Sequence, residues 1–166
     1  MDKLVNIRGI EGYLSSKLIS GNMYYFKYKA KTSNIVYDVY PLIFVTKRIG
    51  TLIEGINFHY FDNQLRMKIF NSLTPFLSEN QLTSDTRLLV KAYRKIILVS
   101  KKQRLAKISF HRYRLKRVRS EILRIPPNKW KESIPMNMEQ FKTSAGKMVK
   151  SNIIFRESML KSIGRM

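Results

Sequence analysis

Residues Arg87–Lys131 read RLLVKAYRKIILVSKKQRLAKISFHRYRLKRVRSEILRIPPNKWK, a stretch that is both strongly basic and regularly apolar. It holds 16 of the chain's 32 Lys and Arg residues, and Glu121 is its only carboxylate. Its net charge is therefore +15, out of +21 for the whole chain. Apolar residues recur at intervals that place them on one face of a helix. They form two sets, Leu88, Leu89, Ala92, Tyr93, Ile96 and Ile97, then Leu105, Ile108, Leu115, Val118 and Ile122.

These two sets predict two amphipathic helices, each with an apolar stripe to bury and a cationic face exposed to solvent. Like charges one helical turn apart repel each other, and this stretch offers almost no acid to pair with them. Clustered Lys and Arg are typical of nucleic-acid binding. We therefore predict a nucleic-acid interface on this basic helical face. Its candidate residues are Lys101, Lys102, Arg104, Lys107, Arg112, Arg114, Lys116, Arg117 and Arg119.

The composition of the rest of the chain limits the classes of protein to consider. A chain of 166 residues is one domain, or one domain with an appendage. Its apolar content of 44% is too high for a disordered protein. It has no cysteine, so disulfides and thiolate metal sites are excluded. No apolar run is long enough to span a membrane, and we expect no membrane partner and no cofactor.

On the N-terminal side of the basic stretch, residues 23–61 predict a small antiparallel sheet or partial barrel. Aromatic and basic residues alternate in MYYFKYKAK, which is the period of a half-buried strand. Pro41 predicts an edge strand or a bend, and Gly50 a hairpin turn. Gly55 predicts a bulge or a close approach of two backbones. Residues 1–22 are expected to form an extended N-terminal arm outside this sheet.

Residues 62–166 are expected to be mainly helical. Asp62 is a suitable N-cap for a helix that would cover the sheet. After the two basic helices, Pro126 and Pro127 end the helical pattern, and Trp130 is expected to pin the chain reversal onto the core. Two further helices are predicted at Met138–Thr143 and Lys147–Ile163. The predicted fold is therefore α+β, with residues 23–166 forming a single domain in which a small sheet packs with amphipathic basic helices.

Few residues could support catalysis. Asp38, Glu54 and His59 lie on neighbouring predicted strands, and clustered carboxylates would be needed for a metal-dependent nuclease. Nothing in their spacing shows that they converge. His59 is better interpreted as a packed, hydrogen-bonded core residue, and His111 as a contact to phosphate or solvent. We predict no metal site and no enzymatic activity.

Aromatic residues offer a second route to nucleic acid. Tyr24, Tyr25, Phe26 and Tyr28, interleaved with lysines, could form a stacking platform for single strands. Alternation along a half-buried strand produces the same pattern, and we favour that interpretation, in which half of this set is core and Tyr25 is an amphipathic surface residue. Tyr113, which lies between two arginines, is a better candidate for contact with a nucleic-acid end.

The central block of the sequence is similar to a family of small virion proteins of T4-type tailed bacteriophages, known as DNA end protectors. The similar segments are YDVYPLIFV, GTLIEGINFHYF followed by LR, FHRYRLKRVRSEILRIPPNKW, and FRES at Phe155–Ser158. The resemblance covers roughly Tyr24–Ser158. It is carried by Tyr37, Asp38, Tyr40, Pro41, Leu42, Phe44, Gly55, Asn57, Phe58, His59, Tyr60, Leu65, Arg66, Arg119, Ile125, Pro127 and Trp130.

The resemblance implies a non-enzymatic structural protein of the virion, present in the host cytoplasm during assembly. Such a protein would bind double-stranded DNA without regard to sequence and protect linear ends during packaging or head completion, beside other virion proteins. A second hypothesis is a tail, baseplate or neck protein whose basic surface docks on an acidic virion partner. A third is a divergent nuclease or an RNA-binding factor.

Overall fold

The computed structural model describes residues 3–31, 35–73, 91, 94–95 and 110–162, and two antiparallel sheets form the framework of this part of the chain. The larger sheet has seven strands in the order β1-β2-β8-β3-β5-β6-β7, and the smaller has three in the order β10-β9-β4. The strands are β1 (Leu4–Ile7), β2 (Ile10–Ser15), β3 (Met23–Tyr25), β4 (Val36–Asp38), β5 (Leu42–Ile49), β6 (Leu52–Asn57), β7 (Phe110–Arg114), β8 (Ile122–Ile125), β9 (Phe141–Thr143) and β10 (Met148–Val149).

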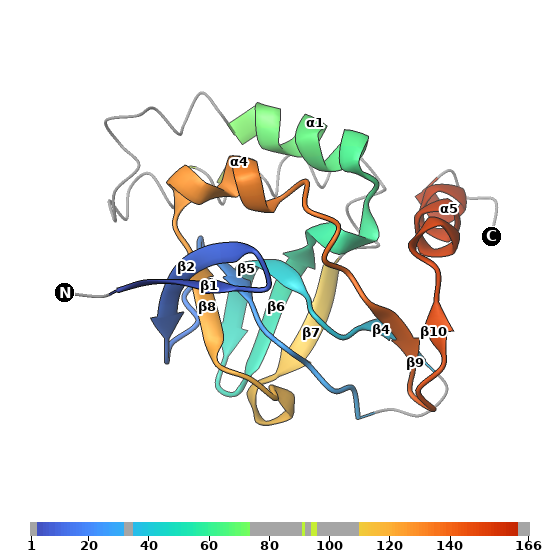
Figure 1. Cartoon of the computed structure of the whole chain (residues 1–166), viewed down its shortest axis with the longest axis horizontal. Helices are drawn as coiled ribbons and strands as arrows, with labels where there is room; N and C mark the ends of the chain where they lie inside the picture. Colours follow the sequence, from blue (N-terminus) through green and yellow to red (C-terminus); the bar gives the residue numbers. More distant parts are fainter. Residues whose placement is uncertain (1–2, 32–34, 74–90, 92–93, 96–109, 163–166) are drawn as a thin grey trace.

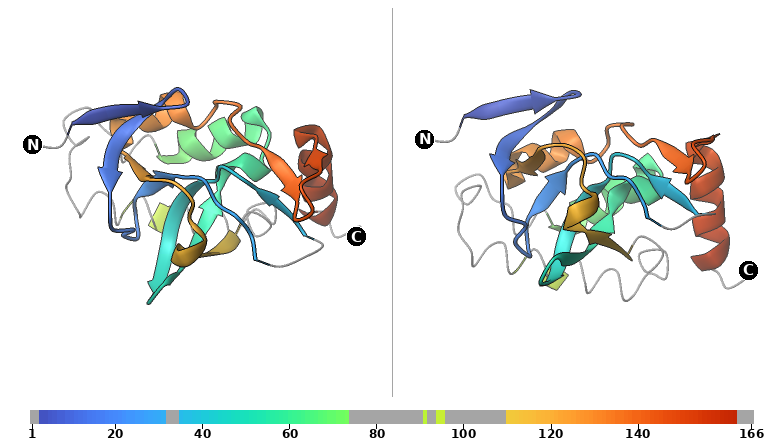
Figure 2. Two further views of the ribbon diagram at one scale, coloured as in Figure 1. Left: turned by 60° about the horizontal axis from the view of Figure 1, so that its bottom comes forward. Right: turned by 90° about the horizontal axis from the view of Figure 1, so that it is seen from below.

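The described helices are short and lie around the sheets. Helices α1 and α4 lie together on one side of the large sheet, while η4 and the turn between β5 and β6 lie on the other (Figures 1 and 2). The small sheet and α5 lie beyond β7. No helix in the described ranges is both long and apolar enough to cross a membrane. The helices are α1 (Asn63–Leu73), α4 (Trp130–Ser133), α5 (Ser151–Ser162), and the 3-10 turns η1 (Phe58–Tyr60), η4 (Leu115–Arg117) and η5 (Pro127–Lys129).

The predicted α+β fold with a basic helical C-terminal half is wrong, because more of the described residues lie in strands than in helices and the large sheet takes up part of the predicted basic helices. Within the second predicted basic helix, Phe110–Arg114 form β7 and Ile122–Ile125 form β8. In β7 the buried Tyr113 alternates with exposed Arg112 and Arg114, which is the period of a strand. The first predicted basic helix lies almost entirely outside the described residues, as do Lys101, Lys102, Arg104 and Lys107.

The ends of the chain also differ from the sequence-based expectation. The segment expected to be an extended arm contributes β1 and β2, and β2 pairs with β8 of the large sheet. The helix predicted at Met138–Thr143 is replaced by β9, because Phe141 is buried and pairs with Asp38 of β4. The last helix, α5, begins at Ser151 because Met148–Val149 first pair with β9 as β10.

The middle strands of the large sheet are buried on both faces. Along β5, Leu42 and Phe44 belong to one apolar cluster, and Ile43 and Val45 belong to the other. Strand β3 divides in the same way, because successive side chains of a strand point to opposite faces. The cluster on the side of α1 and α4 has the larger set of aromatic and aliphatic residues. The opposite cluster includes Tyr28, and Leu115, Val118 and Ile122 pack against it. These three residues pack on the core as predicted, but they lie in or next to η4 and on β8 instead of on a helix.

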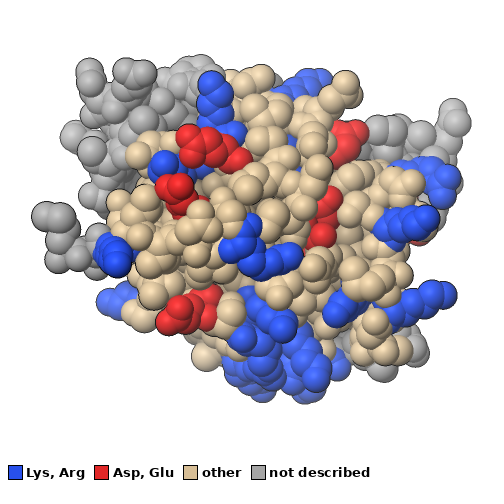
Figure 3. Space-filling view, in the orientation of Figure 1, with Lys and Arg blue, Asp and Glu red and all other residues tan. Residues whose placement is uncertain are grey.

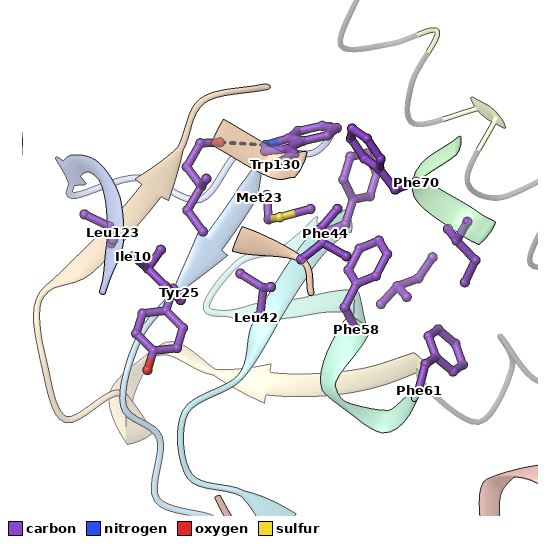
Figure 4. Close-up of a cluster of buried hydrophobic side chains, with 14 residues drawn as sticks. Ile10, Met23, Tyr25, Leu42, Phe44, Phe58, Phe61, Phe70, Leu123 and Trp130 are labelled. Atoms are coloured by element: carbon purple, nitrogen blue, oxygen red, sulfur yellow. Dashed lines mark hydrogen bonds between the residues drawn. The ribbon is translucent and has the colours of Figure 1, made fainter. Parts of the chain in front are cut away.

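Trp130 anchors the chain reversal that follows β8, as the sequence predicted. Its ring is 0% exposed and packs edge-to-face on Phe44, with ring centres 5.7 Å apart. Its indole N–H donates to the carbonyl of Ile125 at 2.8 Å, as Figure 4 shows. A tryptophan deep in a core needs such a partner, because an unpaired buried N–H is costly. The bond therefore fixes the end of β8 against the segment that begins α4.

The hairpin of β5 and β6 also matches its prediction. Gly50 lies in the turn with a φ of 57°, a conformation that glycine adopts readily. A Cβ on Gly55 would lie 2.8 Å from the carbonyl oxygen of Phe44, so the two backbones approach more closely than another residue allows. The register between the strands shifts opposite this point, between Val45 and Lys47. Pro41 lies between β4 and β5, so of its two predicted roles, an edge strand or a bend, the bend is confirmed.

Candidate nucleic-acid interface

Two basic segments that are far apart in the sequence lie side by side on the face opposite α1 and α4. Tyr28 forms an isolated antiparallel bridge with Val118. The N–H of Lys29 donates to the carbonyl of Arg117 at 3.1 Å, and the N–H of Arg119 donates to the carbonyl of Lys27 at 2.8 Å. These backbone bonds bring the exposed lysines of residues 27–31 next to the cations of η4.

The end of the β5–β6 hairpin completes this surface. The N–H of Leu115 donates to the carbonyl of Thr51 at 2.9 Å, and Leu52 pairs with Arg114. Figure 3 shows Lys and Arg gathered at the lower end of the molecule, over η4 and the β5–β6 turn. We call this set the cationic surface. Its residues are Lys27, Lys29, Lys31, Lys47, Arg48, Arg114, Lys116, Arg117 and Arg119, of which only Arg117 is partly buried.

Some of these cations also stabilise the fold. The guanidinium of Arg117 donates to the carbonyls of Lys29 at 3.0 Å and Ala30 at 3.2 Å. That of Arg119 donates to the carbonyls of Lys116 and Val118 at 2.8 and 3.2 Å. Both arginines therefore hold η4 in place with some of their donors. The lysines can extend into solvent, where they repel each other unless an external anion neutralises them.

The predicted site residues divide into three groups. Arg114, Lys116, Arg117 and Arg119 are brought together on the cationic surface. Arg112 lies on β7 but forms an ion pair with Glu54, with Nε and Oε1 2.8 Å apart. Lys101, Lys102, Arg104 and Lys107 lie outside the described residues. That any of these residues binds nucleic acid stays a prediction.

Sequence reasoning missed the four lysines and one arginine that complete the surface. The omitted residues are Lys27, Lys29, Lys31, Lys47 and Arg48. One signal was present, because Lys27 and Lys29 alternate with the buried Phe26 and Tyr28 and so had to face solvent. Their position beside η4 depends on a pairing between segments roughly ninety residues apart, which the local pattern does not contain.

A pocket of about 280 Å³ opens beside the cationic surface, between β4 of the small sheet and β7 of the large one. Its base contains the buried Asp38 and Tyr113. Tyr37 and Tyr60, both partly exposed, line it, and three cations also belong to its lining. The three cations are Lys31, Arg112 and Arg114, and the remaining lining residues are Tyr28, Ala30, Ile35 and Leu52.

The aromatic residues singled out from the sequence are placed mostly in the core. Tyr24, Tyr25 and Phe26 are at most 1% exposed, so the stacking platform is wrong. The core interpretation is confirmed for Tyr24 and Phe26, but the expected surface position of Tyr25 is wrong. Tyr113 is 5% exposed, although it lines the pocket. Burial raises the pKa of its hydroxyl well above the usual value, which keeps the group neutral. His111 stacks on Tyr60, with ring centres 4.3 Å apart.

Asp38 and His59 do meet, but as a buried structural pair. The Oδ2 of Asp38 lies 2.7 Å from Nδ1 of His59 and accepts from Nδ2 of Asn57 at 3.0 Å. Its Oδ1 accepts from the N–H groups of Tyr40 and Gln140 at 3.1 and 3.2 Å. Glu54 does not join them, and no group of three His, Asp or Glu side chains in the described ranges could hold a metal ion.

Burial alone would raise the pKa of the Asp38 carboxyl, but His59, Asn57 and the N–H of Gln140 hold it below its usual range. A carboxyl with a lowered folded-state pKa contributes stability that is present above its unfolded pKa, at about 4, and is lost as the pH falls through the folded value. We therefore expect Asp38→Asn to reduce stability by about 1–3 kcal/mol at neutral pH. This deficit should shrink below about pH 4.

Chemical denaturation of both proteins across pH measures this effect as the difference between their unfolding free energies. His59→Ala provides a comparison in which the carboxyl remains but its close partner is removed. A difference between wild type and Asp38→Asn that stays constant into strong acid would show that folding does not lower the pKa of the Asp38 carboxyl.

A protein-family comparison gives a match over nearly the whole chain. The family model described as phage T4 terminal DNA protecting protein matches residues 3–158. This confirms the resemblance found in the segment Tyr24–Ser158. No curated protein and no solved structure gave a match. The chain therefore belongs to the family of the phage T4 terminal DNA protecting protein.

Proposed function

We propose that this protein binds the ends of linear double-stranded DNA through its cationic surface and protects them without catalysing a reaction. The observation that supports this most strongly is the convergence of Lys27 and Lys29 with Lys116 and Arg119 on one face. The family's description, which names protection of terminal DNA, supports the choice of polyanion. We further propose that the protein acts in the virion with other virion proteins, and in the host cytoplasm during assembly.

The chemistry of the surface supports binding that is independent of DNA sequence. Lysine ammonium groups contact phosphates as point charges and carry no information about base sequence. Each phosphate that is neutralised releases counterions, so affinity falls steeply with salt, with a slope of about −0.9 per contact. About six contacts would give a slope near −5. This behaviour suits a protein that must cover an end of any sequence.

A non-enzymatic role agrees with the chemistry at the candidate catalytic residues. The side chains of Asp38 and His59 are at most 1% exposed, so a phosphodiester could not reach them without rearrangement of the core. Glu54 lies against Arg112 instead of completing a carboxylate cluster. The described candidates are thus engaged in the fold, and burial keeps the Asp38–His59 pair out of contact with a phosphate on the cationic surface.

The proposal is tested with two DNAs of the same sequence, one a blunt-ended duplex and the other closed at both ends by hairpin loops. We expect salt-sensitive binding to both, with an affinity at least about tenfold higher for the open duplex. Fluorescence anisotropy measures both affinities. Equal affinities would contradict end protection while leaving DNA binding intact. No binding to either DNA at about 0.1 M salt would favour the second hypothesis, docking of the basic surface on an acidic virion protein.

A further inference from the structure

We propose that the pocket between β4 and β7 receives the terminal nucleotide of a DNA strand. This inference rests on the proposed function, since it explains how a surface that contacts phosphates could distinguish an end from continuous duplex. Every phosphate of a duplex carries the same charge, so the cationic surface alone would bind the interior of a DNA molecule as well as its end. End selectivity needs a feature that only an end can satisfy.

The pocket has the chemistry for a nucleotide. Three cations line it, Lys31, Arg112 and Arg114, and each is exposed enough to reach a phosphate at its opening. Tyr37 is partly exposed and offers aromatic surface to a base, whereas the ring of Tyr60 already packs against His111 and Phe141 and forms part of the wall. Stacking on an aromatic side chain tolerates any sequence because every base has a π-face. The combination of cations with aromatic rings therefore fits a single nucleotide of any identity.

The charge balance of the pocket favours an anion. Asp38 is the one carboxylate among the described lining residues, and its two oxygens already accept hydrogen bonds from Tyr40, Asn57 and Gln140 and contact His59. Arg112 is drawn partly toward Glu54, while Arg114 and Lys31 have no carboxylate partner within the described part of the chain. A phosphate would therefore be held near Arg114 and Lys31, away from the buried carboxylate.

The size and position of the pocket complete the argument. Its volume of about 280 Å³ is at the lower end of the range for small-molecule sites, about 300–1,000 Å³, so it suits one nucleotide better than a longer segment. Arg114 and Lys31 belong to both the pocket and the cationic surface, so a duplex on that surface could bring its end to the opening. A terminal base has one stacking neighbour and leaves the duplex more easily than an internal base, which has two.

Two variants test the pocket without changing the charge of the cationic surface. Ala30→Trp fills the pocket, and Tyr37→Ala removes one of its aromatic walls. We expect both to bind the closed DNA as the wild type does, and to lose about tenfold in affinity for the open duplex. Val36→Ala is the matched control, because Val36 is the exposed neighbour of Tyr37 on β4 and does not line the pocket.

The outcomes separate the two proposals. If both variants keep the wild-type preference for open ends, the pocket is not the end-binding site, while end protection itself stands. If the wild-type protein shows no preference for ends, the proposed function fails, and the pocket's role fails with it. Thermal melting of each variant checks that it is folded.

Photocrosslinking of the wild-type protein gives a readout that does not depend on variants. A duplex with 5-iodouracil at a terminal position, on the 5′ end in one DNA and on the 3′ end in another, should crosslink to Tyr37 or Tyr60. The same base placed in the interior should not crosslink there. Crosslinks from terminal positions only to residues outside the pocket would overturn the inference.

Discussion

Replacing Arg66 by methionine is expected to lower the free energy of unfolding by about 3–5 kcal/mol, which corresponds to a fall in Tm of roughly 10 °C or more. Arg66 lies on α1 and is 0% exposed. Its Nε donates to the carbonyl of Phe61 at 2.8 Å, and its Nη1 donates to those of Ile134 and Met136 at 3.3 and 3.0 Å. Its Nη2 lies 3.2 Å from Oε2 of Glu139 and donates to the carbonyl of His59 at 3.4 Å.

The loss would be large because one side chain satisfies several buried groups. Methionine would fill much of the same space but would leave four carbonyls without this donor and Glu139, 5% exposed, without its cation. An uncompensated buried charge accounts for most of the cost. Arg66 also links α1 to the segment between α4 and β9, so its loss would loosen the cover of the larger apolar cluster.

Urea denaturation of wild type, Arg66→Met and Arg66→Lys measures the effect. Lysine keeps the charge but lacks the planar fork of donors, so we expect an intermediate loss. Lys68→Met is the matched control on the same helix, because Lys68 is exposed, and it should change stability by less than about 0.5 kcal/mol. A loss below about 1 kcal/mol for Arg66→Met would show that these buried contacts contribute little.

Local features of the sequence were sufficient to predict several elements. The N-cap at Asp62 is present, with its Oδ1 accepting from the N–H of Leu65 at 2.9 Å. The hairpin at Gly50, the close backbone approach at Gly55 and the anchoring role of Trp130 were also predicted. Each depends on residues within one turn or one strand pair, so the local pattern contains the information.

The basic stretch was misinterpreted because its apolar spacing fits more than one structure. Leu115, Val118 and Ile122 recur at helical intervals, yet they reach the core from η4 and from β8. The alternation in FHRYR was the competing signal, and pairing of β7 with β6 decided in its favour. Helical spacing in a short apolar pattern is therefore weak evidence for a helix where the two-residue period of a strand overlaps it.

The candidate site was only half visible in the sequence. Arg114, Lys116 and Arg119 were named because they are clustered along the chain, whereas Lys27 and Lys29 join them through non-local pairing. The pocket likewise depends on β4 and β7 meeting from different sheets. Arg66 had a local signal, since it lies three and four residues before Ile69 and Phe70 and so shares their buried face.

Reversing three charges of the cationic surface is expected to reduce DNA affinity by about a hundredfold or more at about 0.1 M salt, because each lost phosphate contact removes close to one power of ten at that concentration. The triple variant is Lys27→Glu, Lys29→Glu and Lys116→Glu. All three side chains are exposed, and their one contact among the described residues is a long cation–π approach of Lys27 Nζ to the Tyr40 ring, 6.0 Å from its centre, so folding should change little.

The matched control makes the same change in net charge elsewhere. It reverses three other exposed lysines that lie away from η4. They are Lys3 just before β1, Lys68 on α1 and Lys131 on α4. Reversing these three should lower affinity only slightly, through the overall field of the protein, which salt screens. The comparison therefore separates the position of the charges from their number.

The most direct measurement is the salt dependence of binding to one blunt-ended duplex, recorded for the wild type and for both triple variants. With phosphates seated on the cationic surface, the slope of log affinity against log salt should become shallower by about 3 in the Lys27, Lys29 and Lys116 variant. The slope of the control should match the wild type. If both triple variants lose affinity and slope equally, DNA responds only to the total charge, and the cationic surface is not its binding site.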